Sequence, residues 1–168
     1  MLDDIAFMKE ALKEAQEAFQ AGEVPIGAVL VDAEGTVVAR AHNMRETWHD
    51  GTAHAEIIAL QEAARKLGRW RLSGLTLYVT IEPCPMCAGA LVMSRVDRVV
   101  YGATDAKAGA CESLFNIVRH PALNHQLEMR AGVLEDECRA IMKRFFRQRR
   151  KKSSALKKCA NQAFDAPE

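Results

Sequence analysis

The spacing of apolar residues along the chain predicts alternating helices and strands. A repeat of three to four residues indicates a first helix that Asp3 or Asp4 can cap and that Gly22 ends. Its apolar face comprises Ile5, Met8, Leu12, Ala15 and Phe19. Similar repeats predict further helices at residues 53–66 and 86–94 and from residue 136 onward, and short apolar runs predict strands at residues 28–31, 36–39, 76–80, 98–102 and 127–130.

The order of these elements predicts a single α/β domain. The turn at residues 32–35 joins the first two strands as an antiparallel hairpin. Further along the chain helices and strands alternate, which predicts right-handed crossovers between parallel strands. Residues 44–52 are polar and irregular, and residues 103–124 show no clear periodicity. We expect one domain at residues 1–152 that includes a basic C-terminal helix, followed by a partly disordered tail at residues 153–168.

The composition is that of a folded protein in a reducing compartment. Hydrophobic residues make up 49% of the 168 residues and charged residues 27%, which excludes disorder of the whole chain. No apolar run approaches the ~18–20 residues of a membrane helix, so we expect no membrane partner. The five cysteines are unevenly spaced, and the N-terminus lacks the basic and apolar stretches of a secretory signal. We therefore expect a cytoplasmic setting.

The charges are distributed unevenly although they nearly cancel. The chain carries 23 Lys and Arg against 22 Asp and Glu, a net charge of +1 that by itself argues against a nucleic-acid partner. Residues 139–158, however, contain ten of the basic side chains and no acidic one, and the other 148 residues carry 13 basic against 22 acidic. Such a run is usually a solvated helix face, but its position can also indicate RNA binding.

Two short segments, His54-Ala55-Glu56 and Pro83-Cys84-Pro85-Met86-Cys87, carry groups that bind metals and move protons. One helical turn brings the sulfurs of Cys84 and Cys87 onto a single ion, and a helix N-terminus there favours their thiolate forms. His54 offers a third ligand, which leaves the fourth position of a tetrahedral zinc to water. Because two thiolates weaken the Lewis acidity of Zn²⁺, a nearby base must take the proton of that water, and Glu56 is placed for this.

Each of these residues has another interpretation when it is taken alone. The two cysteines could be a redox pair or half of a structural zinc site, and His54 could be a packed or surface histidine. Glu56 could be a solvated helix residue. A fourth ligand that closes the site could come from Cys111, Cys138 or Cys159. The combination of both segments, each following a strand, favours a catalytic zinc.

Longer segments around these motifs resemble the bacterial tRNA-specific adenosine deaminases of the cytidine deaminase-like superfamily. The H-x-E and P-C-x-x-C motifs mark the superfamily. The narrower family is marked by D-A-K at residues 105–107, H-P-A-L-N-H at residues 120–125 and F-F-R-Q-R-R at residues 145–150. The resemblance extends from about Ile5 to Arg150. It implies a three-layer α/β/α fold with a central mixed five-stranded sheet and helices on both faces.

The resemblance also implies the chemistry of the site. The ligands of one Zn²⁺ per chain would be His54, Cys84 and Cys87. Zinc-bound hydroxide is expected to attack C6 of a flipped-out adenine while Glu56 protonates the neighbouring ring nitrogen and then the departing amine, giving inosine and ammonia. Asn43, which would otherwise be a turn residue, is expected to hydrogen-bond the purine. The backbone N–H groups of Ala55 and of the Cys84 turn are expected to orient it.

The substrate that the resemblance implies is the wobble adenosine in the anticodon loop of an arginine tRNA. Asp105 and Lys107 would contact the flanking nucleotides, and His120 and Asn124 would line the RNA groove. The basic C-terminal helix would add Phe145, Arg147, Arg149 and Arg150. Taken alone, each of these would be a solvated charge or a packing residue. The family works as a homodimer, and the small residues of the helix at residues 86–93 are consistent with a dimer seam.

Three other functions are compatible with parts of the sequence. A deaminase of a free base or nucleoside, such as guanine or cytosine, shares the core motifs but gains nothing from the basic C-terminal helix. A deaminase–reductase of riboflavin synthesis would need room for a second domain. A non-catalytic structural-zinc RNA-binding module would have a fourth protein ligand and could dispense with Glu56.

Overall fold

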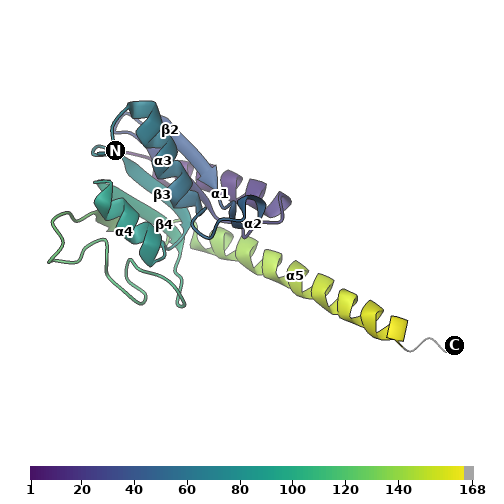
Figure 1. Cartoon of the computed structure of the whole chain (residues 1–168). Coiled ribbons are helices and arrows are strands. Elements are labelled where there is room, and N and C mark those ends of the chain that lie inside the picture. Colours follow the sequence, from purple (N-terminus) through teal and green to yellow (C-terminus); the bar gives the residue numbers. More distant parts are fainter. Residues whose placement is uncertain (165–168) are drawn as a thin grey trace.

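Five strands form one mixed sheet with helices on both faces (Figure 1). The computed structural model describes the backbone of residues 1–164 and the side chains of residues 1–157. In the sheet order β2-β1-β3-β4-β5, the strands are β1 (Gly27–Val31), β2 (Val37–His42), β3 (Thr76–Ile81), β4 (Arg98–Ala103) and β5 (Glu128–Arg130). β1 is antiparallel to β2 and to β3, whereas β3, β4 and β5 are parallel. The mixed five-stranded α/β fold expected from the sequence is confirmed.

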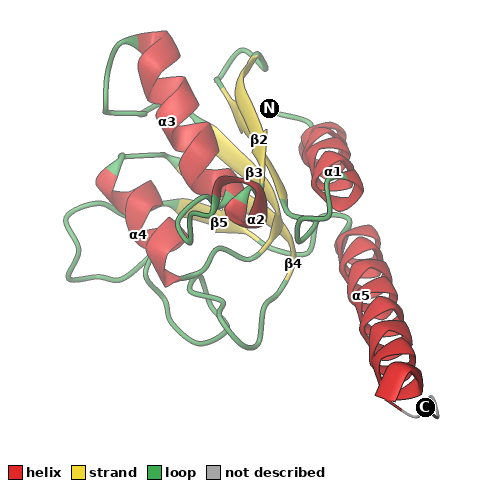
Figure 2. Cartoon of the chain, turned by 45° about the vertical axis from the view of Figure 1, so that its right-hand side comes forward, coloured by secondary structure: helices red, strands yellow, loops and turns green. Residues whose placement is uncertain are grey.

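The helices cover the sheet in two layers (Figure 2). One face carries α3 (Ala55–Leu67) and α4 (Pro85–Met93), and the other carries α1 (Asp4–Gln20) and the start of α5 (Glu135–Phe164). Each face has its own apolar core, because side chains along a strand alternate between the two sides. In β3, Leu77 and Val79 belong to the core under α3 and α4, and Tyr78 belongs to the core under α1. All of β3 is buried, as its unbroken apolar run predicts.

The prediction that Ile5 belongs to the buried face of α1 is wrong, because its side chain is 52% exposed. The buried residues of the helix are Asp4, Met8, Ala11, Ala15 and Ala18. The cause is the close approach of α1 to β1. A Cβ on Gly27 would lie 2.0 Å from the carbonyl oxygen of Ala11 and 2.4 Å from the nitrogen of Ala15. Only small side chains fit between helix and strand at this distance, so Ala11 and Ala15 face β1 there, and Met8 is buried one turn earlier.

Two segments without clear periodicity have different structures. Within residues 44–52, expected to be irregular, one turn of helix forms as α2 (Arg45–Trp48). The buried Glu23 accepts hydrogen bonds from the backbone nitrogen of Thr47 at 2.7 Å and from its hydroxyl at 2.9 Å, so it caps this turn from another part of the chain. Residues 104–127, between β4 and β5, form turns and loops throughout.

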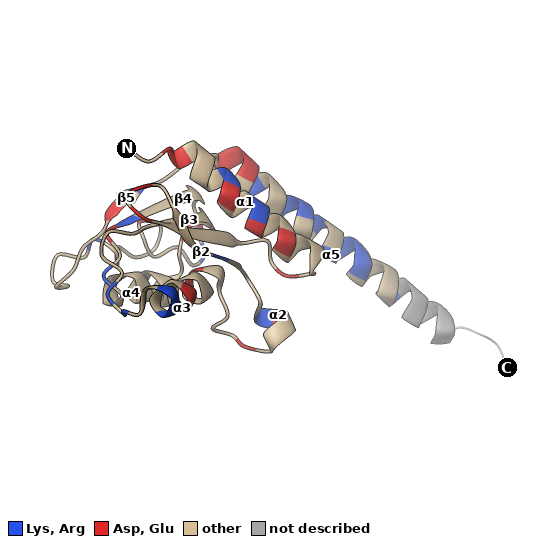
Figure 3. Ribbon diagram, turned by 90° about the horizontal axis from the view of Figure 1, so that it is seen from above, with Lys and Arg blue, Asp and Glu red and all other residues tan. Residues whose placement is uncertain are grey.

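α5 continues beyond the sheet as a basic helix. It begins at Glu135, one residue before the predicted start, and passes through the expected boundary at residue 152 to end at Phe164. Lys and Arg line its projecting part, whereas many of the acidic residues lie on α1 and the body of the domain (Figure 3). Residues 165–168 of the expected tail lie outside the described residues. In the described part of the chain, no helix has the length and apolar character needed to cross a membrane.

Candidate active site

The two predicted metal-binding segments meet at the N-termini of α3 and α4. His54 directly precedes α3 and Cys84 directly precedes α4, both with extended backbone, and neither side chain caps its own helix. Pro85 is the first residue of α4, where its fixed φ suits the helix, and Cys87 follows in the same turn. The side chains are therefore free to approach one another. Nδ1 of His54 lies 3.6 Å from Sγ of Cys84 and 3.5 Å from Sγ of Cys87.

These three atoms form a donor set that fits a metal ion. All of them lie within 4.8 Å of one another, and one nitrogen with two sulfurs is a combination typical of zinc. Among the described side chains, neither Cys111 nor Cys138 belongs to the cluster. The side chain of Cys159, the other possible fourth ligand, lies outside the described residues. Three protein ligands leave one tetrahedral position for water or substrate.

The protonation of the cluster favours a cation at its centre. The hydrogen bond from Cys87, together with the neighbouring His54, lowers the pKa of Cys84 to about 4. The same hydrogen bond and burial raise the pKa of Cys87. The hydrogen bond to Cys84 also raises the pKa of His54. The cluster therefore favours a charged sulfur on Cys84, and a divalent cation at this place would stabilise both sulfurs as thiolates.

Glu56 lies in the first turn of α3, two residues after His54, and is only 4% exposed. Burial raises the pKa of its carboxyl to about 6, although the helix N-terminus and the neighbouring His54 favour the charged form. The charges of both His54 and Cys84 act on the pKa of this carboxyl, which places it beside the donor set. A carboxyl with this pKa can both accept and release a proton near neutral pH.

A small pocket of about 60 Å³ adjoins this cluster, and its lining includes His54. Asn43, which is 3% exposed, and Ala55 also line it, so the structure brings together two of the residues predicted to hold the purine. The amide of Asn43 donates to the carbonyl of Val24 at 3.4 Å and accepts from the backbone nitrogen of Arg45 at 3.4 Å. Both bonds are long, so this amide can re-pair with a ligand at little cost. Arg45 lines the pocket as well and was not predicted from the sequence.

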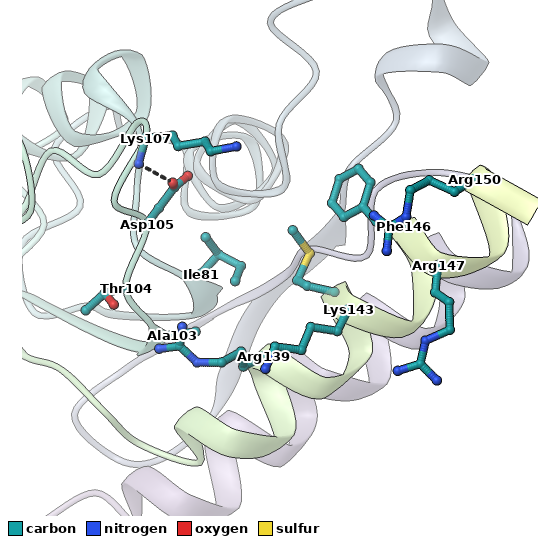
Figure 4. A pocket seen from close by; sticks show the side chains of 11 residues that line it. Ile81, Ala103, Thr104, Asp105, Lys107, Arg139, Lys143, Phe146, Arg147 and Arg150 are labelled. Carbon is teal, nitrogen blue, oxygen red and sulfur yellow. Dashed lines mark hydrogen bonds between the residues drawn. The ribbon is translucent and has the colours of Figure 1, made fainter.

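A larger groove of about 890 Å³ lies between α5 and the ends of β3 and β4 (Figure 4). The predicted Asp105 and Lys107 line one side, and the predicted Arg147 and Arg150 line the other. Its floor is apolar, with Ile81, Ala103, Met142 and Phe146. Two residues separate the end of β3 from Cys84. The groove and the segment that carries Cys84 therefore both lie at the carboxyl end of β3.

Four predicted RNA contacts lie outside the residues that line this groove. Phe145 is 6% exposed and packs edge-on against Phe19, with ring centroids 5.7 Å apart. Arg149 lies over the ring of Phe145, 5.9 Å from its centroid, on another side of α5. His120 and Asn124 are exposed in the long connection before β5. Their contact with RNA stays a prediction, and so does that of Phe145 and Arg149.

Arg139, Met142 and Lys143 of α5 also line the groove, and the sequence prediction did not name them as site residues. The helical periodicity could have indicated these residues, because positions 139, 143, 146, 147 and 150 fall on one face of a helix. Arg149, which belongs to the same F-F-R-Q-R-R segment, lines a different pocket together with Phe19 and Phe145.

A three-layer α/β/α scaffold that holds a His/Cys/Cys donor set beside a buried glutamate is the arrangement of the cytidine deaminase-like class. The sequence matches the MafB19-like deaminase family over residues 2–150. It is 54% identical to the tRNA-specific adenosine deaminase of Bacillus subtilis (strain 168) over 158 residues, which cover 94% of this chain and 98% of that protein. The chain therefore belongs to the family of the tRNA-specific adenosine deaminases.

Solved structures agree with this assignment. The chain resembles a structure from a study of A-to-I editing by tRNA:A34 deaminases at the wobble position of transfer RNA, with a TM-score of 0.78 and 46% identity over 81% of this chain and 98% of that one. It also resembles a guanine deaminase from Nitrosomonas europaea, with a TM-score of 0.72 and 25% identity over 86% and 85% of the two chains. The scaffold is therefore shared with enzymes that act on different substrates.

Proposed function

We propose that this chain is a zinc-dependent deaminase that hydrolyses adenosine to inosine at the wobble position of an arginine tRNA. The observation that carries the proposal is the buried Glu56 beside the donor set of His54, Cys84 and Cys87, in a chain 54% identical to a tRNA-specific adenosine deaminase. A structural-zinc module has no use for a buried carboxyl at this place, because its burial lowers stability unless the group has a function.

The donor set would hold one zinc ion per chain, which supplies a Lewis acid that makes water a nucleophile near neutral pH. Glu56 accepts the proton of that water and passes it to the ring nitrogen next to the attacked carbon. The water oxygen bonds to that carbon, and Glu56 then takes the proton of the resulting hydroxyl group. As the carbon–nitrogen bond breaks, Glu56 gives this proton to the departing amine, so that inosine and ammonia leave. The raised pKa of Glu56, about 6, allows both directions of transfer within one catalytic cycle.

The purine would bind in the pocket that Asn43 and Ala55 line. Asn43 offers both a donor and an acceptor to the edge of the base. Ala55 is the first residue of α3, so its N–H has no partner within the helix and can donate to the base or to a developing negative charge. The sugar and its phosphates would stay outside this small pocket, in keeping with a base that leaves its stack to enter.

The RNA around the target base would follow the groove beside α5. The groove combines an apolar floor with cationic side chains from α5 and Lys107, which suits bases and phosphates together. A deaminase of free guanine or cytosine has no substrate that would occupy such a surface. We further propose that the chain forms a homodimer in the cytoplasm through α4, where Met93 is 68% exposed and Gly89 and Ala90 allow close packing.

The test is deamination of a synthetic anticodon stem-loop of an arginine tRNA with adenosine at the wobble position. We expect inosine at that position alone, detected by mass spectrometry of the digested RNA. A matched stem-loop with its adenosine moved to another loop position is the control. Purified protein should contain about one zinc per chain, and a Cys87→Ser variant much less. Inosine at the control position, or none at the wobble position, would contradict the proposed specificity.

A further inference from the structure

Glu82 is a buried carboxylate between β3 and the metal-binding segment, and it is 2% exposed. Its Oε1 accepts hydrogen bonds from the backbone nitrogens of Cys111 at 3.1 Å, Glu112 at 2.8 Å and Ser113 at 2.9 Å. Its Oε2 accepts from the backbone nitrogen of Asp105 at 3.0 Å and from the hydroxyl of Ser113. All five donors therefore come from one loop, residues 105–113, and both carboxylate oxygens are used.

Two further contacts hold the same loop against the chain that carries Cys84. The backbone nitrogen of Ala110 donates to the carbonyl of Pro83 at 2.8 Å. Gly109 lies so close to Glu82 that a Cβ on it would be 2.3 Å from Oε2 of the carboxylate. The loop is thus closed around one side chain, and a glycine is needed where the backbone passes it.

The loop also carries two of the groove residues. Asp105, whose nitrogen is bonded to Glu82, accepts on its Oδ1 from the backbone nitrogens of Lys107 at 2.9 Å and Ala108 at 3.2 Å. The place of Lys107 at the rim of the groove therefore depends on Asp105, and the place of Asp105 depends on Glu82 (Figure 4).

We propose that Glu82 is a positioning residue that fixes the 105–113 loop relative to Cys84, so that Asp105 and Lys107 meet the nucleotides beside the target base. This inference rests on the proposed function, since it assigns the loop an RNA substrate. A glutamine at position 82 keeps the shape of the side chain but replaces one acceptor oxygen by an amide that faces backbone N–H donors. The loop then loses its order, while the donor set of His54, Cys84 and Cys87 keeps its contacts.

The test compares Glu82→Gln with Glu112→Gln, which removes one negative charge from the same loop but contributes only its backbone nitrogen to Glu82. For Glu82→Gln we expect zinc content as in the wild type, kcat for the stem-loop within about threefold of wild type, and a KM raised about tenfold or more, as for the loss of charge-assisted hydrogen bonds. Glu112→Gln should leave both constants near wild type. A drop in kcat with unchanged KM would overturn the positioning role.

A double-mutant cycle separates positioning from general destabilisation. Lys107→Ala alone should raise KM several-fold, but in the Glu82→Gln background it should change KM by less than about twofold, because Lys107 is already displaced. Full additivity of the two effects would overturn the inference.

Limited trypsin digestion measures how well the 105–113 loop is ordered when no substrate is present. Cleavage after Lys107 should be faster in Glu82→Gln than in wild type or Glu112→Gln, and equal rates would overturn the anchoring. If Glu82→Gln fails to fold, Gly109→Ala perturbs the same contact from the side of the loop. This variant should show the same rise in KM and the same faster cleavage. Wild-type values for both would also overturn the proposed role of Glu82. A wild-type chain inactive on the stem-loop would contradict the proposed function, whereas the digestion still decides whether Glu82 anchors the loop.

Discussion

Replacement of Asp4 by Asn should weaken the fold at neutral pH by an amount that disappears in acid. The Asp4 side chain is 4% exposed and joins α1 to three strands. It accepts hydrogen bonds from both terminal nitrogens of Arg98 at 2.8 and 2.9 Å, from the hydroxyl of Tyr78 at 2.8 Å and from Arg130 at 2.5 Å. It also lies at the N-terminus of α1, where a negative charge is favourable.

The magnitude follows from the pKa of this carboxyl. Burial alone would raise the pKa of Asp4, but the hydrogen bonds from Arg98, Tyr78 and Arg130 outweigh it and lower the pKa from 3.8 to about 2. Such a shift corresponds to about 2.5 kcal/mol of folding free energy at pH 7. Asn also leaves Arg98 buried without its charged partner, so we expect a total loss of about 2–4 kcal/mol. In a chain of this size the melting temperature should fall by about 5–10 °C.

The pH dependence has a defined sign. Because the folded-state pKa is below the unfolded one, the contribution of Asp4 is fully present above pH ~4 and is lost as the pH falls toward about 2. The difference in unfolding free energy between wild type and Asp4→Asn should therefore be constant from pH 7 to pH 5 and shrink below pH 4. Urea unfolding followed by circular dichroism at a series of pH values measures it.

The neighbouring Asp3 provides a matched control. Its carboxylate is exposed and caps α1 by accepting from the backbone nitrogens of Ile5 and Ala6 at 3.1 Å. Asn is an equally good cap, so Asp3→Asn should change stability by less than about 0.5 kcal/mol. An Asp4→Asn loss below about 1 kcal/mol at pH 7, or a loss that does not depend on pH, would refute the account of this buried cluster.

Three further variants test other parts of the structure. Glu56→Gln should keep zinc and RNA binding but lower kcat on the stem-loop by about 10²–10⁴-fold, and activity near wild type would remove Glu56 from the mechanism. Gly27→Ala should lower the unfolding free energy by at least about 1–3 kcal/mol, because its Cβ meets the backbone of α1, and an unchanged melting temperature would contradict that close approach. Neutralising the cationic side chains of Arg147, Arg149 and Arg150 should weaken stem-loop binding and reduce the slope of log K against log salt by about 2; an unchanged slope would indicate a solvated helix face.

Local signals predicted most of the sheet and the cluster of possible metal ligands. The hairpin turn at residues 32–35 and the alternation of helix and strand from residue 53 predict the antiparallel pair of β1 with β2 and the parallel pairs of β3 with β4 and β4 with β5. The antiparallel pairing of β1 with β3 was not predicted. His54 and Cys84 could be recognised because each directly precedes a helix, and Glu56 and Cys87 because each lies within one turn of such a ligand. Spacing within a helical turn is a property of the local sequence.

Features that depend on distant segments could not be predicted in this way. The close approach of α1 to β1 depends on Gly27, which lies against the backbone of Ala11 and Ala15. The groove is formed by the loop after β4 together with one face of α5, and only the fold brings these together. In the sequence, Glu82 is simply a charged residue at the end of a strand. Its hydrogen bonds go to a loop more than twenty residues further along the chain, which the local sequence does not indicate.

The choice of substrate is tested most directly by one competition measurement on the zinc-loaded protein. The arginine anticodon stem-loop, free guanine and free cytosine are supplied together, and inosine in RNA, xanthine and uracil are quantified from the same reaction by mass spectrometry. The proposed function predicts inosine at the wobble position with no xanthine or uracil above the level of the Glu56→Gln variant. Formation of xanthine or uracil without inosine would contradict it and identify a deaminase of free bases.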